Sequence, residues 1–204
     1  MDENLVKVRH ERSVKDFPEL KLEEDEYVVF SITRAKVCLF MTFIGLGAGF
    51  IVVLLLFLTV ILGQSMLDEM GKNFLLIILM ILFAAAVIAG IFFYIVYKGN
   101  KMFITNKRVM QFVMTTPVSN SINIIDLGSI EDASFRQNGI LQQIFNYGTL
   151  RLSTVGDETT YTFKYSDIAP DNLREITELI TRAKKITRKP KYSAKNEDSD
   201  ADSL

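Results

Sequence analysis

The chain has 204 residues and a formal net charge of -1, so no overall positive field argues for nucleic acid as a partner. Its single cysteine excludes an internal disulfide and any metal cluster built on cysteines. Hydrophobic residues make up 49% of the chain, but they gather between residues 37 and 97. The composition therefore indicates a membrane segment within an otherwise polar chain, with no metal site and no cofactor.

The chain opens with a polar segment, residues 1–26. The first 36 residues carry seven Lys/Arg and nine Asp/Glu, which is not the pattern of a cleavable signal peptide. The only histidine, His10, stands in this charged stretch, and we expect it at the surface. Nothing in residues 1–26 decides whether they fold onto a domain. Residues 27–36 form a strand-like lead-in that is a candidate to extend the sheet of a later domain.

Two uncharged runs follow, residues 37–62 and 74–97. A helix rises about 1.5 Å per residue and the hydrocarbon core is about 30 Å thick, so about 20 residues suffice to cross it. Both runs clear that length, and the connection between them is too short for a domain. The sequence therefore predicts a transmembrane hairpin over residues 37–97.

Basic residues flank the outer ends of the hairpin, whereas the connection between the two runs contains only Lys72. This bias predicts a two-span protein of the plasma membrane with both termini in the cytoplasm. No ionisable side chain interrupts either run, which argues against a transporter or channel. Small residues at Gly45, Gly49, Ala86 and Gly90 allow close helix packing, either within the hairpin or between protomers.

Residues 98–187 read as a β domain with a C-terminal helix. Short β-rich runs alternate with turn signals, among them Asn106-Lys107, Asn138-Gly139 and Gly156-Asp157. The expected strands cover residues 101–105, 108–114, 121–125, 127–135, 147–153 and 159–165, with Gly128 as a bulge or bend. Pro170 opens an amphipathic helix in which Leu173, Ile176, Ile180 and Ala183 share one face. Residues 188–204 are poor in apolar side chains and rich in Lys, Ser and Asp, and we expect a disordered tail.

The chain resembles the bacterial pleckstrin-homology-like (bacterial PH domain) membrane proteins from residue 23 to about residue 186. Glu26, Arg34, the string Ile104-Thr-Asn-Lys-Arg-Val109 and the string Ile144-Phe-Asn-Tyr-Gly-Thr149 carry the resemblance, in this order around a membrane hairpin. It implies an α+β, PH-like fold, a bent antiparallel sheet of about seven strands capped by a C-terminal helix. It implies no reaction. Within these strings we expect Asn106 and Gly148 in turns or bulges, and Ile104, Val109 and Phe145 in the core.

The soluble region after Tyr97 contains neither His nor Cys, so it cannot supply a Ser-His or Cys-His catalytic pair. We therefore expect a non-enzymatic protein-interaction or scaffolding module at the cytoplasmic membrane surface, with a protein partner or self-association. The alternative is recognition of anionic lipid headgroups. The candidate lipid-surface contacts are Lys98, Lys101, Lys107, Arg108, Arg182, Lys184, Lys185, Arg188, Lys189 and Lys191. The rival interpretation of these charges is topology determination and complementarity to the helix dipole.

Overall fold

A computed structural model describes residues 3–62, 68–154, 160–168 and 170–188. The chain forms two compact units, one helical and one mostly β. The helical unit contains α2 (Lys36–Ile61) and α3 (Glu69–Gly99), and residues 114–120 belong to the same unit. The predicted turn at Gly156-Asp157 and all but the first residue of the predicted tail lie outside the described residues. Arg188 itself is the last residue of a helix.

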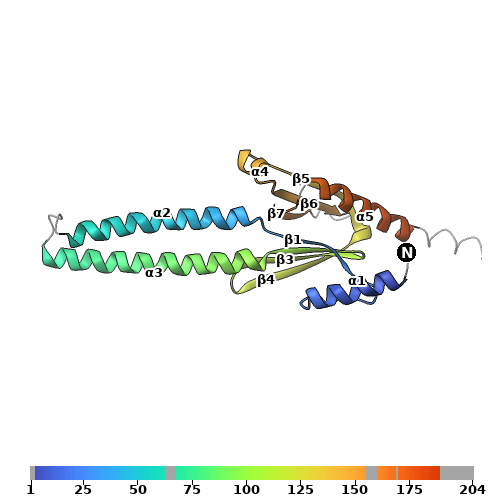
Figure 1. Cartoon of the computed structure of the whole chain (residues 1–204), viewed down its shortest axis with the longest axis horizontal. Coiled ribbons are helices and arrows are strands. Elements are labelled where there is room, and N and C mark those ends of the chain that lie inside the picture. Colours follow the sequence, from blue (N-terminus) through green and yellow to red (C-terminus); the bar gives the residue numbers. More distant parts are fainter. Residues whose placement is uncertain (1–2, 63–67, 155–159, 169, 189–204) are drawn as a thin grey trace, which may run out of the picture. The chain divides into compact units, whose positions relative to one another are not determined.

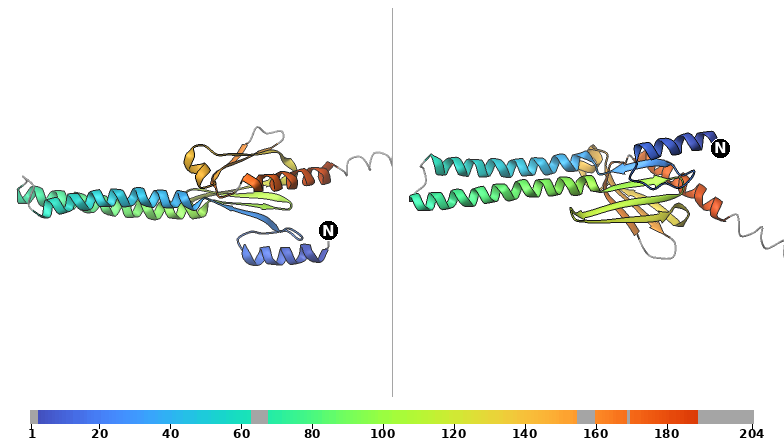
Figure 2. Two further views of the ribbon diagram at one scale, coloured as in Figure 1. Left: turned by 45° about the horizontal axis from the view of Figure 1, so that its top comes forward. Right: turned by 90° about the horizontal axis from the view of Figure 1, so that it is seen from below.

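The helices α2 and α3 coincide with the two predicted spans and run side by side (Figures 1 and 2). Both are long and apolar enough to cross a membrane. The rings of Phe50 and Phe83 lie 5.2 Å apart between them, and Gly90 faces Leu46. Helix α3 begins at Glu69 rather than at residue 74, because the Asp68 carboxylate accepts a hydrogen bond from the Gly71 N–H at 3.0 Å and caps the helix.

The β unit holds seven described strands in two antiparallel sheets. The first sheet has the order β1 (Val28–Thr33), β2 (Lys101–Thr105), β3 (Arg108–Thr116), β4 (Ser119–Asp126). The second has the order β5 (Ile130–Arg136), β6 (Gly148–Thr154), β7 (Thr160–Ser166). With its C-terminal helix, this unit confirms the expected α+β, PH-like fold.

The strand that precedes the hairpin completes the first sheet. Thr33 pairs with Lys101, so the chain leaves the sheet for α2 and returns to the neighbouring strand after α3. A bridge between Arg34 and Ser166 and a hydrogen bond from the Gln111 side chain to the Thr162 carbonyl, 3.1 Å, connect the two sheets.

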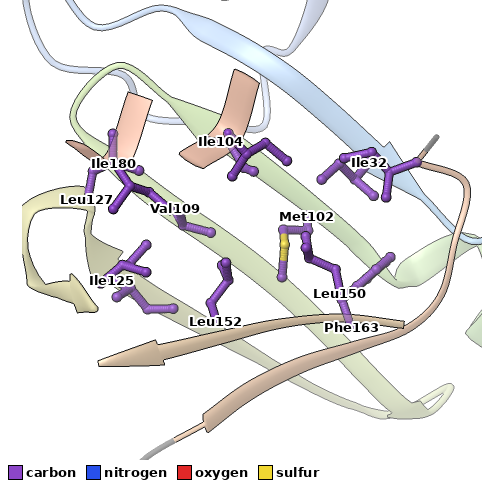
Figure 3. Close-up of a cluster of buried hydrophobic side chains, with 13 residues drawn as sticks. Ile32, Met102, Ile104, Val109, Ile125, Leu127, Leu150, Leu152, Phe163 and Ile180 are labelled. Atoms are coloured by element: carbon purple, nitrogen blue, oxygen red, sulfur yellow. The ribbon is translucent and has the colours of Figure 1, made fainter. Parts of the chain in front are cut away.

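The main core lies between the two sheets and α5 (Pro170–Arg188), as Figure 3 shows for the labelled side chains. Alternating residues of β2 and β6 enter it, because successive side chains of a strand point to opposite faces. Helix α5 packs against β5 and contributes the predicted apolar face, with Ile176 and Ile180 buried and Leu173 and Ala183 packed beside them.

Two local predictions differ from the structure. The strand expected over 127–135 begins only at Ile130, because Gly128, expected as a bulge or bend, belongs to a 3-10 turn, η1 (Leu127–Ser129), in which the Asp126 carboxylate accepts a hydrogen bond from the Gly128 N–H at 2.7 Å. A short helix, α4 (Ile140–Ile144), follows Gly139, whose φ of 94° suits glycine. Because this helix points its apolar side chains outward, Phe145 is exposed and does not belong to the core.

The N-terminal segment folds onto the opposite face of the first sheet. Helix α1 (Glu3–Asp16) is followed by residues that bury Leu20 against Phe103 and Met110, and the Phe17 ring meets the Phe103 ring edge-on at 5.2 Å. In Figure 2, α1 and α5 lie on opposite sides of this sheet. Residues 3–26 are thus an ordered part of the β unit, which the sequence left undecided.

Candidate functional site

A dense polar cluster of the β unit surrounds one fully buried carboxylate. Glu26 accepts hydrogen bonds from Arg108 Nε at 2.9 Å and Arg108 Nη2 at 2.8 Å. It also accepts one from the Thr105 hydroxyl at 2.8 Å and one from the Glu23 N–H at 2.9 Å. Strand β2 supplies the threonine and β3 the arginine, while Glu26 lies two residues before β1. We call Glu26, Thr105 and Arg108 the Glu26 clasp.

Two opposing effects act on the ionisation of Glu26. Burial raises the pKa of its carboxyl, since it removes water from the charged form. The hydrogen bonds from Arg108, Glu23 and Thr105 and the charge of Arg108 outweigh that effect, so the pKa of Glu26 lies below its ordinary value. The hydrogen bond to Glu26 raises the pKa of Arg108 against the effect of burial. The clasp is therefore an ion pair at neutral pH.

The neighbouring residues of the string 104–109 hold the same loop. The Asn106 side chain accepts a hydrogen bond from the Tyr27 N–H at 3.0 Å and donates one to the Asp25 carbonyl at 2.9 Å. Lys107 Nζ donates to the Glu24 carbonyl at 2.8 Å. Asn106 lies in the predicted turn, and its side-chain amide also forms hydrogen bonds with residues 25 and 27, about 80 positions earlier in the sequence. The string is a structural clamp on the residues that lead into β1.

The carboxylate of the clasp is engaged by groups of the protein itself. Four donors already surround the Glu26 carboxylate, and each belongs to the fold. Within the described residues, no group of three or more His, Cys, Asp or Glu side chains is placed to hold a metal ion. His10 is half-buried rather than at the surface, and its Nδ1 lies 2.7 Å from the Glu26 carbonyl oxygen. The cluster therefore holds the N-terminal segment to the first sheet.

The predicted basic contacts near the hairpin are largely engaged by acidic residues of the N-terminal segment. Lys101 Nζ lies 2.8 Å from a Glu19 oxygen, and Lys107 Nζ lies 3.7 Å from a Glu23 oxygen. Arg108 belongs to the clasp. Lys101 begins β2 and Lys107 lies in the turn after its other end, so the sheet does not gather them into one patch. Lys98 is on α3, with its Nζ 5.0 Å from the centre of the Tyr94 ring.

The second basic group lies on or after the last turns of α5. Arg182 is 3.8 Å from Glu178, Lys184 donates to the Glu131 carbonyl at 2.9 Å, and Lys185 is exposed. The side chain of Arg188 and the whole of Lys189 and Lys191 lie outside what the structure describes. Among the predicted contacts whose side chains the structure describes, Arg182, Lys184 and Lys185 share one helix.

A separate feature is the edge of the first sheet. No described strand pairs with the outer edge of β4. Ile125 of this strand points into the core, whereas Ile122 and Ile124 are exposed on the other face. An unpaired edge that carries exposed β-branched side chains is a surface on which another strand can add. The alternation in residues 121–125 predicted a half-buried strand but not which side would remain uncovered.

Three comparisons relate the chain to known proteins. A family model described as "Bacterial PH domain" matches residues 39–184. Among solved structures, the chain is similar to a DUF1696 family protein with a pleckstrin-homology domain from Shewanella loihica, at 15% identity and a TM-score of 0.31. That similarity covers 42% of this chain and 70% of the other. The comparison with curated proteins finds no match.

Proposed function

The chain belongs to the bacterial PH domain family, and on that premise we propose that it is a membrane-anchored, non-catalytic protein-binding module at the cytoplasmic surface of the plasma membrane. The observation that carries the binding role is the uncovered edge strand β4. A protein partner or a second copy of the chain would dock there, with no cofactor, metal or nucleic acid involved.

Burial supports the membrane anchor. In α2 and α3, only 6% of the most apolar window of each helix is buried, whereas the core helix of a soluble protein is mostly buried. So much exposed apolar surface needs a covering, and lipid provides one. Pairing of β1 with β2 requires the chain ends on both sides of the hairpin to lie on one side of the bilayer, as two spans allow. The flanking basic residues favour the cytoplasmic side.

Topology is tested with reporter fusions at Leu204 and within residues 63–67. We expect a cytoplasmic reporter to be active at Leu204 and an external reporter to be active in the connection. The opposite pattern would overturn the orientation, and full-length chain that remains in solution without detergent or lipid would overturn the anchor.

The edge of β4 fits strand addition. An extended partner segment would form main-chain hydrogen bonds with β4, while its side chains contact Ile122 and Ile124. The anchor raises the effective concentration of the module for partners in the same membrane. Two exposed isoleucines beside an unpaired strand edge suit a peptide strand better than a charged ligand.

Site-specific photocrosslinking in cells tests this surface. A photoreactive residue at Ile122 or Ile124 should give a discrete adduct heavier than the chain, and Ile124→Lys should remove the adduct formed from position 122, because a charge blocks an edge. The matched control is Glu175, exposed on α5. No adduct at either isoleucine, or the same adducts at Glu175, would refute β4 as the binding surface.

The alternative ligand is an anionic lipid headgroup, and the grouping of Arg182, Lys184 and Lys185 on α5 favours it. The test uses the full chain, because a fragment that begins at residue 98 lacks β1 and the Glu26 clasp. Lipid retention measured by native mass spectrometry should be selective for anionic lipid and weaken in Arg182→Gln/Lys185→Gln if the alternative holds. Equal retention of anionic and zwitterionic lipid would remove it.

A further inference from the structure

The loop between β5 and β6 carries a dense group of exposed apolar side chains. Its helix α4 and the next residue expose Ile140 (75%), Leu141 (48%), Ile144 (67%) and Phe145 (48%). Between Arg136 and Arg151 the sequence contains no charged residue. A soluble surface loop normally carries polar side chains, and a contiguous apolar patch on a surface indicates a contact.

Strand pairing fixes the end of the β unit at which this loop lies. Gly148, at the start of β6, pairs with Ser166, and Ser166 forms a bridge with Arg34. Arg34 is two residues before α2, and Asn100 directly follows α3. The loop therefore lies at the end of the β unit at which the chain leaves for α2 and returns from α3, as the path of β1 shows in Figure 1. No linker separates this end from the two apolar helices.

Several polar groups of the loop have hydrogen-bond partners within it, which suits an environment poor in water. The Phe145 N–H donates to the Leu141 carbonyl at 3.1 Å and the Tyr147 N–H to the Gln142 carbonyl at 3.0 Å. The Gln142 side chain accepts a hydrogen bond from the Asn138 N–H at 2.6 Å. Backbone groups that enter the membrane interface need such partners, because unsatisfied groups are costly there. These hydrogen bonds fix the conformation of the loop, and in this conformation its apolar side chains point outward.

We infer that α4 is a second membrane contact of this chain, in which Ile140, Leu141, Ile144 and Phe145 insert among the lipids of the leaflet from which α2 and α3 emerge. This inference rests on the proposed membrane anchor. The absence of charge removes the main cost of insertion. Tyr165, which is exposed and lies with its ring 6.4 Å from that of Tyr147, is a residue type enriched at membrane interfaces.

Nitroxide labels on the full chain in lipid nanodiscs test the inference, in a Cys38→Ala background that removes the native thiol. The test label replaces Ile144, whose exposure leaves room for it. The aqueous control replaces Glu131, exposed on β5 and about 16 Å along that strand from Arg136. The membrane control replaces Leu54, which is exposed on α2 seven residues before the end of that helix. Each label is tested for collision with oxygen, which concentrates in lipid, and with a water-soluble nickel complex.

We expect the label at 144 to resemble the label at 54, with oxygen collisions favoured, and the label at 131 to favour the nickel complex. A label at 144 that behaves like that at 131, while 54 remains in lipid, overturns the inference and leaves the anchor intact. An aqueous label at 54 overturns both. A label at 144 protected from both reagents, with a short distance to its equivalent in another copy, identifies a protein contact and overturns the inference.

Discussion

Removing Arg108 leaves the buried carboxylate of Glu26 without its countercharge. The substitution Arg108→Ala deletes the donors at 2.9 and 2.8 Å, while Glu26 stays out of reach of water. Removing one partner of a buried ion pair costs about 3–5 kcal/mol. Glu26 can escape that cost by binding a proton, which from its ordinary pKa of 4.5 costs about 3 kcal/mol at pH 7. Since 22% of the Arg108 side chain is exposed, we expect a loss of about 3 kcal/mol.

The pH dependence of stability should change sign in this variant. In the native chain the folded pKa of Glu26 is lowered, so its contribution is complete above the unfolded pKa and disappears as pH falls through the folded pKa. Without Arg108, burial raises the folded pKa of Glu26 above the unfolded value, and stability is then lost as pH rises. The deficit of Arg108→Ala relative to the native chain should therefore shrink to about 1 kcal/mol near pH 4.5, where the lost hydrogen bonds remain.

Hydrogen–deuterium exchange of the detergent-solubilised full chain measures this effect in peptides that cover β1 and β2. After correction for the intrinsic pH dependence, exchange at pH 7 should accelerate about a hundredfold in Arg108→Ala. The matched control is Arg174→Ala, which breaks an exposed pair with Glu178 and should change stability by less than about 0.5 kcal/mol. A deficit that stays constant or grows on acidification refutes the reasoning, as does a pH dependence that persists when Glu26→Gln is added.

Three further changes test other parts of the fold. Gly148→Ala should destabilise the second sheet by about 1–3 kcal/mol, because the new Cβ would lie 2.7 Å from the Arg136 carbonyl oxygen; thermal unfolding measures it, with exposed Ser134→Ala as control. Leu20→Ala should cost about 2–4 kcal/mol and accelerate proteolysis of α1, and cleavage rates equal to those of Leu5→Ala, which is exposed, would contradict the docking of this segment. Asp68→Ala should cost about 1 kcal/mol, visible as faster exchange in residues 69–73 alone, and unchanged exchange there would argue against the cap.

The sequence predicted those elements whose signals are local. The uncharged runs marked α2 and α3, and the spacing of Leu173, Ile176 and Ile180 marked the buried face of α5. The turn at Asn106-Lys107 followed from residue type. Each of these rests on a period or a composition that a short window contains.

The candidate site was missed because its parts are far apart in the sequence. Glu26 and Arg108 are 82 residues apart, and no periodicity relates them. Phe17, Leu20 and Leu22 were a visible apolar exception in a charged stretch, but only the uncovered face of β2 and β3 gives them a partner. Helix α4 was missed for another reason, since its apolar side chains point outward, opposite to the expectation that placed Phe145 in the core. Whether such outward-facing side chains are covered depends on a lipid or a partner, which the sequence of this chain does not contain.

The position of the hairpin inside the sheet explains why the clasp is so heavily hydrogen-bonded. Strands β1 and β2 would normally be joined by a short turn, but here 67 residues, 34–100, separate Thr33 from its partner Lys101. Loop closure grows more costly only slowly with length, so the insertion adds little to the cost of pairing. It does remove the turn that would set the register of the pair. Glu26, Asn106 and Arg108 supply that information at the other end of the same two strands, where they hold the start of β1 to the β2–β3 turn. The string 104–109 therefore does for this sheet what a tight turn does for an ordinary hairpin.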